Sequence, residues 1–328
     1  MFAHCHRRLW VLRLKNSLLS LPALAILSSG VSLAACGSGD SGSSPNSAAK
    51  APFDVAITSS DLAVGKQRFA FVALQNDNPI NHETMYLRFF KVPAKGSPSL
   101  VGEGPIEWSP LSVAPAQEHK ASGHLDTEIT GVYYANVVFD EAGTWGLGVS
   151  RGDKLDEQRE VRVSFTVRAT TQAPSIGSRA VPVKNPTSRD LPMKQIDTSP
   201  IPDPSFHVLS VAEAIASGKP SVIAFATPSF CVSRTCGPAM EVVTEVWRAA
   251  PDQFNVVHVE PYQLSPDGEL VLDANKQRIN NEAGNLWHLP SEPWVFVVDS
   301  KGVVVARFDG PFALDELTSA LAEAGVRG

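Results

Sequence analysis

The proline-rich segment from residue 169 to residue 205 is the feature that most restricts how this chain can fold. It holds seven prolines, and proline lacks the amide hydrogen that regular helices and strands use. Such a segment is typical of an extended, semi-rigid connector, or of a strap that wraps along a neighbouring domain. A chain of 328 residues is long enough for about two domains. We therefore expect one folding unit before the connector, at residues 53–168, and one after it, at residues 206–328.

Residues 53–168 have the pattern of an all-β unit. Short stretches rich in β-branched and aromatic residues alternate with turns rich in glycine, proline and asparagine. From Val161 to Val167 every second residue is apolar, which is the period of a strand with one buried face. Short strands of this kind predict an immunoglobulin-like β-sandwich, and the segment from residue 131 to residue 149 resembles extracytoplasmic domains of that type.

Residues 206–328 have a different pattern, in which apolar runs of strand length are separated by apolar residues at helical spacing. Residues 221–226 form a continuous apolar run, as expected of a strand buried on both faces. Between Pro238 and Ala249 the apolar residues fall at helical spacing, and Pro238 suits the first turn of that helix. The predicted elements are a helix at 208–217, a strand at 221–226, a helix at 238–249, a strand at 254–259, a short helix ending near 287, two strands at 294–298 and 303–308, and a helix at 314–324.

The N-terminus has the organisation of an export signal. Basic residues precede an apolar run from Leu18 to about Val31, which is shorter than the roughly 20 residues that a membrane span needs. The next residues, Leu-Ala-Ala-Cys at positions 33–36, resemble the lipobox of bacterial lipoproteins, in which the peptide is cut before the cysteine and the cysteine is acylated. The resemblance implies a signal peptide at residues 1–35 and a lipid anchor at Cys36.

The segment after the lipobox and the net charge indicate where this protein acts. Residues 36–52 are rich in glycine and serine, which predicts a flexible tether. The expected location is the extracytoplasmic face of the cell membrane, with the protein held there by its lipid anchor. Without the first 35 residues the chain has 24 basic and 34 acidic residues. This acidic balance argues against nucleic acid as a partner, because phosphate contacts need a basic face.

Only two of the four cysteines remain to act in the folded part of the chain. Cys5 would leave with the signal peptide and Cys36 would carry lipid, so Cys231 and Cys236 are left, in a compartment that permits a disulfide. Across a continuous helix the Cα atoms of this pair would lie about 7.5 Å apart along the axis. A disulfide needs a separation of about 4.4–6.8 Å. If the pair closes, residues 232–235 must form a loop or turn rather than helix.

The surroundings of this pair resemble the thioredoxin superfamily. In the sequence FATPSFCVSRTCGP, which ends at Pro238, a buried strand leads to a cysteine pair at the start of a helix, with the aromatic Phe230 before the first cysteine. Pro293, in the sequence Ser-Glu-Pro-Trp before the terminal strand pair, stands where that family keeps a cis-proline facing the cysteines. The resemblance and the element order imply an α/β thioredoxin fold for residues 206–328 and a cis bond between Glu292 and Pro293.

The same motif supplies what thiol chemistry requires. The thiolate is the reactive form of cysteine, and the start of a helix favours it through free N–H groups and a partial positive charge. Arg234, between the cysteines, would add a further positive charge. Two assignments of the attacking sulfur remain open. Position after the strand and Phe230 favours Cys231, whereas closeness to the predicted helix start favours Cys236, to which we assign the lower pKa.

The motif also departs from the family pattern in three ways. Four residues rather than two separate the cysteines. Ala224 occupies the strand position where thioredoxins often bury a carboxylate for proton transfer, and Glu292 stands where the family usually has a small or apolar residue. A carboxylate beside the sulfurs would disfavour a thiolate and repel acidic partners. Alternatively, Glu292 would replace the missing proton carrier or bind a metal.

The function predicted from the sequence is that of a membrane-tethered thiol–disulfide oxidoreductase. Its partners would be protein thiols or disulfides of the cell envelope, and we expect no cofactor. A second interpretation is copper handling, because Sco-type copper proteins resemble this pattern and soft thiolates suit Cu(I). The ligands would then be Cys231, Cys236 and a histidine, with His288 a better candidate than His258. A third is a non-catalytic binding module in which the cysteine pair is a static disulfide.

Overall fold

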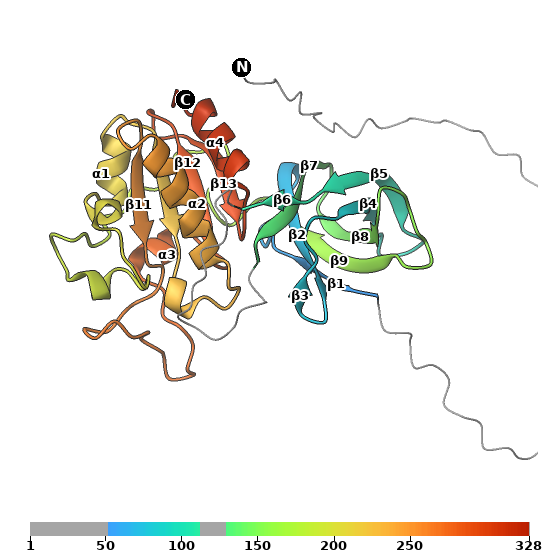
Figure 1. The fold of residues 1–328 in the computed structure, drawn as a ribbon, viewed down its shortest axis with the longest axis horizontal. Coiled ribbons are helices and arrows are strands. Elements are labelled where there is room, and N and C mark those ends of the chain that lie inside the picture. The colour runs from blue at the N-terminus through green and yellow to red at the C-terminus, as the bar shows by residue number, and fades with distance from the viewer. Residues whose placement is uncertain (1–51, 112–128, 328) are drawn as a thin grey trace, which may run out of the picture.

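The computed structural model of this chain describes residues 52–111 and 129–327 (Figure 1). The signal peptide at residues 1–35, the anchor at Cys36 and nearly all of the predicted tether lie outside these ranges. Within the two ranges, no helix is both long enough and apolar enough to cross a membrane.

The N-terminal unit consists of two antiparallel sheets. The order of the first is β1-β2-β7-β6 with β3 paired to β2, and the order of the second is β5-β4-β8-β9. Their strands are β1 (Asp54–Ile57), β2 (Gly65–Gln75), β3 (Asn78–Pro79), β4 (Thr84–Lys91), β5 (Ser99–Glu107), β6 (Ser109–Pro110), β7 (Gly131–Phe139), β8 (Gly143–Arg151) and β9 (Val161–Val167).

The two sheets of this unit share one aromatic core. Phe69 from β2 meets Phe89 from β4 edge to face, with 5.1 Å between ring centroids, and Phe139 from β7 meets Trp145 from β8 at 4.9 Å. Along β9 the three polar residues are exposed while Val161 and Val167 are buried. The alternation predicted for this strand is therefore confirmed.

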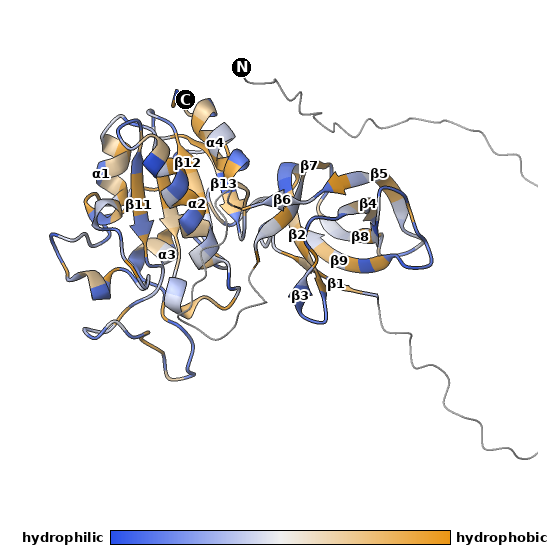
Figure 2. Cartoon of the chain, in the orientation of Figure 1, coloured by the Kyte–Doolittle hydropathy of each residue, from blue (hydrophilic) through white to orange (hydrophobic). Residues whose placement is uncertain are grey.

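The C-terminal unit is built on a four-stranded mixed sheet of order β11-β10-β12-β13, in which only β10 and β11 run parallel. Figure 2 shows that its central strands are largely hydrophobic, and every residue of β10 and β12 is buried. The elements are 3-10 turns η1 (Met193–Gln195), η2 (Pro204–His207) and η3 (Pro228–Phe230), helices α1 (Val211–Ala216), α2 (Cys236–Ala249), α3 (Glu282–Leu286) and α4 (Leu314–Glu323), and strands β10 (Ser221–Phe225), β11 (Asn255–Val259), β12 (Trp294–Val298) and β13 (Val304–Asp309).

The fold class expected from the sequence is wrong. We expected an immunoglobulin-like sandwich followed by an α/β thioredoxin fold, whereas the described residues are mostly β-sheet, in three antiparallel or mixed sheets. The four helices of the described ranges are short, with 6, 14, 5 and 10 residues. The described part of the chain is therefore mainly β, and an α/β fold does not describe it. Helical spacing of apolar residues indicates where a helix lies, but it does not determine what fraction of the residues in a folded unit is helical.

The proline-rich segment wraps along the C-terminal unit and is no free spacer. Ala173, Ala180 and Val183 are buried in the same apolar cluster as Ile223 of β10 and Phe296 of β12. Backbone amides join it to β13 as well: Gly177 donates to the carbonyl of Val304, and Val304 donates to that of Ser178, at 2.8 and 2.9 Å. Of the two forms predicted for this segment, the strap is the one observed.

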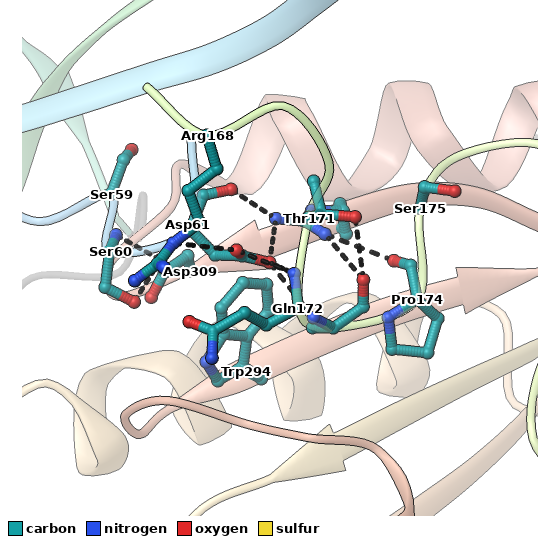
Figure 3. Close-up of polar contacts among 12 residues, drawn as sticks. Ser59, Ser60, Asp61, Arg168, Thr171, Gln172, Pro174, Ser175, Trp294 and Asp309 are labelled. Carbon is teal, nitrogen blue, oxygen red and sulfur yellow. Dashed lines mark hydrogen bonds and ion pairs between the residues drawn. The ribbon is translucent and has the colours of Figure 1, made fainter. Parts of the chain in front are cut away.

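A buried polar cluster joins the β-unit, the strap and β13 (Figure 3). The Asp61 carboxylate, which has no exposed surface, accepts hydrogen bonds from the backbone of Gln172 and Ala173 and from Arg307 at 2.9 Å. The Arg307 guanidinium also lies over the ring of Trp294, 4.9 Å from its centroid. The position of β12 is thereby coupled to the β-unit.

Asp309 forms a second polar contact at the same joint. Its carboxylate accepts hydrogen bonds from the hydroxyl of Ser60 at 2.7 Å and from the hydroxyl of Ser291 at 3.2 Å. Ser291 immediately precedes Glu292, so this contact connects the β-unit to the loop before β12. Burial raises the pKa of Asp309 to about 6.

Candidate functional site

Cys231 and Cys236 form a disulfide between the end of η3 and the first residue of α2. Their Cα atoms lie 6.0 Å apart, within the ordinary disulfide range. Val232 and Ser233 form a turn, and Arg234 has a φ of 59° in the left-handed region. The prediction that residues 232–235 are not helical is confirmed.

The two sulfurs are in different environments. Cys236 has no exposed surface, whereas Cys231 is partly exposed. The backbone N–H of Cys236, at the start of α2, donates to Cys231 Sγ over 3.2 Å. Ser233 Oγ lies 3.2 Å from the same sulfur. The free amide of the helix start therefore points at Cys231 and not at Cys236.

The loop before β12 contacts the cysteine turn directly. The peptide bond between Glu292 and Pro293 is cis, as predicted, and Pro293 is buried. Ser233 donates its hydroxyl hydrogen to the carbonyl of Glu292 over 3.1 Å. One serine thus contacts both the exposed sulfur and the proline loop, so a partner bound to that sulfur would also meet this loop.

The carboxylate of Glu292 is paired rather than free. Arg278 donates to it at 2.8 Å and the hydroxyl of Tyr262 donates at 2.5 Å. Arg278 also donates to the carbonyl of Phe230, next to Cys231, and lies over the Tyr262 ring. Burial is the main cause that raises the pKa of Tyr262 to about 12. The repulsion expected from a bare carboxylate is therefore offset by a positive charge.

Sequence reasoning did not find Arg278 or Tyr262. Both lie in the polar stretch between β11 and α3, where isolated bridges pair Tyr262 with Asn280 and Leu272 with Arg278. This folding-back returns Arg278 to the cysteine loop. The stretch shows no helical or strand period, so no sequence signal singled out either residue.

The remaining predicted site residues lie as follows. Arg234 is exposed on the turn between the cysteines. Ala224 is buried in β10 opposite His258 of the parallel strand β11. A buried carboxyl group occurs instead at Glu260, just after β11, where burial raises its pKa to about 7. Thr198 donates to Glu260 at 2.8 Å.

The ligand set of the copper interpretation is not assembled. His288 is exposed after α3, and it shares no group of close ligand atoms with the cysteines. In the described ranges, the residues whose metal-binding atoms gather within 4.8 Å of one another are Asp197, His207 and His258. His258 therefore belongs to this separate buried cluster and not to the disulfide.

No family model matches this chain, and no curated protein matches it. The chemistry of the site must therefore be argued from its own geometry.

Proposed function

We propose that this protein is a thiol–disulfide oxidoreductase whose working group is the Cys231–Cys236 disulfide, with Cys231 as the sulfur that exchanges with partners. The observation that carries the proposal is the asymmetry of the pair. The exposed sulfur accepts the first free amide of a 14-residue helix, and the other sulfur is fully buried beneath it. A disulfide that served only to crosslink would need no such difference between its ends.

The exchange proceeds in two balanced steps. A partner thiolate attacks Cys231 Sγ, a new sulfur–sulfur bond forms, and the Cys231–Cys236 bond breaks with its electron pair leaving on Cys236, which then takes a proton. A second thiolate of the partner attacks its own sulfur in the mixed disulfide and releases Cys231 as a thiolate. That thiolate is stabilised by the amide of Cys236 and, through its charge, by the helix start. The partner is oxidised by two electrons and this protein is reduced by two, and the reverse sequence oxidises the protein.

The partners that fit are protein thiols or disulfides of the cell envelope. A polar depression beside the proline loop, lined by Tyr262, Arg278, Asn280 and Ser291, offers hydrogen-bonding groups to an extended chain. The resemblance of residues 33–36 to a lipobox supports anchoring through Cys36 at the extracytoplasmic face of the membrane. We propose that the protein is anchored there.

The reduction potential of the pair tests the proposal. The protein without its signal segment is equilibrated with dithiol buffers, its free thiols are trapped, and the oxidised fraction is read by mass spectrometry. A reversible couple between about −270 and −120 mV is the expected result, since working oxidoreductases fall in that range. A potential below about −300 mV would show a static crosslink and refute the proposal.

Two matched variants assign the roles of the sulfurs. Cys236→Ser should accumulate a mixed disulfide with a disulfide substrate, because Cys231 attacks the substrate and displaces one of its sulfurs as a thiolate, and this chain then has no second cysteine at the site to release the product. Cys231→Ser should capture none, because its remaining thiol is buried. Equal capture by both variants would contradict the assignment of Cys231.

A further inference from the structure

A second cluster of reactive side chains lies apart from the disulfide and plays no part in the proposed exchange. Asp197 comes from the strap after η1, His207 ends η2, and His258 lies in β11. All three side chains are buried, with no more than 2% of each exposed. Asp197 Oδ2 lies 2.9 Å from His207 Nε2 and 3.3 Å from His258 Nδ1. Two imidazoles thus converge on one carboxylate oxygen in the interior of the protein.

The second nitrogen of His258 fixes which of its atoms is free to bind. His258 Nε2 lies 3.0 Å from the carbonyl oxygen of Ala226. A carbonyl oxygen only accepts, so this nitrogen carries the hydrogen. In the neutral ring, Nδ1 then directs a lone pair at the Asp197 oxygen, and two acceptors face each other. Either a proton on Nδ1 or a metal cation between the two atoms removes this conflict.

We infer that Asp197, His207 and His258 bind one divalent transition-metal ion of the zinc type. The ligand atoms are the Asp197 carboxylate, His207 Nε2 and His258 Nδ1. Two imidazoles and a carboxylate are a donor set that zinc prefers, at about 2.0–2.2 Å from the ion. Tetrahedral ligand atoms at such bond lengths lie roughly 3.4 Å apart. Asp197 Oδ2 lies 2.9 and 3.3 Å from the two nitrogens, and all three ligand atoms lie within 4.8 Å of one another.

The surroundings also have the features of a metal site. A ligating histidine usually donates its other ring N–H to a backbone carbonyl or a carboxylate, and His258 donates to Ala226 in this way. The other oxygen of Asp197 accepts the backbone N–H of Ser199 at 2.6 Å. Both contacts orient the ligands toward the same point.

The carboxyl groups around the cluster are a separate reason to infer a bound cation. Negative charge nearby favours a buried divalent ion, because an uncompensated charge is costly in the interior. Glu260, two residues after His258, is only 4% exposed. Its Oε2 accepts the hydroxyl of Thr198, next to Asp197, and its Oε1 has no hydrogen-bond partner among the described residues. Asp197 supplies one negative charge, and Glu260 is a second buried carboxyl group in the same region.

The ion would act as a structural clamp. Its three ligands come from the strap, from η2 and from β11 at one edge of the sheet, and none is exposed. Ala226, which accepts from His258, is the first residue after β10 on the way to the cysteine loop. Metal bound at this cluster would therefore fix the strap to the sheet beneath the disulfide.

Refolding with metal tests the inference. The protein, with its disulfide intact, is unfolded in a chelator, refolded with Zn²⁺ or Co²⁺, and separated from loose metal before its metal content is measured by plasma mass spectrometry. One ion per chain is expected, together with a cobalt spectrum of tetrahedral nitrogen and oxygen ligands without sulfur-to-metal bands. Protein that retains neither metal, or that shows only the spectrum of hydrated cobalt, overturns the inference.

Matched variants locate the ion. His207→Gln should lower the affinity by more than the roughly 10–100-fold typical of changes outside the ligand set. His288→Gln, which alters an exposed histidine, should retain one ion per chain. The double variant Cys231→Ser/Cys236→Ser should also retain it, which makes this test independent of the proposed redox function. Full retention by His207→Gln, or loss of metal from the double serine variant, would contradict the assignment.

Discussion

Replacing Asp61 with asparagine should destabilise the folded protein by about 3–5 kcal/mol, the usual cost of removing one partner from a buried ion pair. Arg307 is 9% exposed and would keep its charge while losing the carboxylate that accepts its hydrogen bond at 2.9 Å. The asparagine would also turn an NH₂ group toward a backbone N–H, because both carboxylate oxygens of Asp61 accept from Gln172. The measurement is urea unfolding at neutral pH, followed by circular dichroism and tryptophan fluorescence.

A double-mutant cycle isolates the pair. Arg307→Met alone leaves the buried Asp61 carboxylate with Arg168, 4.0 Å away and half exposed, as its charged partner, and this variant should also cost about 3–5 kcal/mol. The loss of unfolding free energy in the double variant should be smaller, by about 2 kcal/mol, than the sum of the losses in the two single variants, because the double variant removes both charges at once. Glu83→Gln is the control, since Glu83 pairs with Arg151 at the surface and such pairs contribute about 0–1 kcal/mol. Costs that add within about 0.5 kcal/mol would refute the coupling of Asp61 and Arg307.

Three further predictions concern protonation, exposure and charge at the site. Because the pKa of Asp309 is raised from 3.8 to about 6, the folded protein holds this proton more tightly than the unfolded chain, so the contribution of this group to stability is lost as pH rises from about 4 to 6. The free energy of unfolding of Asp309→Asn, measured in urea, should therefore exceed that of the unmutated protein by about 3 kcal/mol at pH 7 and be equal to it at pH 3.5, since one pKa unit is about 1.4 kcal/mol. A difference that does not change with pH would contradict this. After mild reduction, iodoacetamide should alkylate Cys231 at least about tenfold faster than Cys236, because only the exposed thiolate reacts readily. Peptide mass mapping measures both rates, and equal rates would contradict the proposed difference between the two sulfurs. Arg278→Met should slow reduction of the Cys231–Cys236 disulfide by an anionic thiol more than its reduction by neutral dithiothreitol, because the carboxylate of Glu292 near the disulfide loses its positive partner. Equal slowing by both reagents would assign Arg278 a packing role only.

The features predicted correctly from sequence are local ones. The strand at 294–298, the turn between the cysteines and the cis bond before Pro293 each depend on residues within a few positions of one another. Hydrophobic period, disulfide reach and proline chemistry act at that range. The fold class depends on helix length and on how strands pair across the chain, and the prediction of an α/β unit failed there.

The parts of the site that sequence did not reveal come from distant segments. Arg278 reaches Glu292 and Phe230 only because the polar stretch after β11 folds back on itself. Which sulfur is exposed likewise depends on packing, and the sequence argument favoured the buried one. The cluster of Asp197, His207 and His258 joins three segments that no spacing rule connects.

The strap along β13 has a consequence for solubility. β13 is the last strand of its sheet, and an uncovered edge strand offers unpaired amides and carbonyls to any other extended chain. Gly177 and Ala180 donate to the carbonyls of Val304 and Gly302, while the Val304 amide donates to Ser178. These bonds occupy the edge with the protein's own chain. A fragment cut at residue 206 would therefore free the backbone groups of Gly302 and Val304 at the start of this edge, where an extended chain from another copy could add.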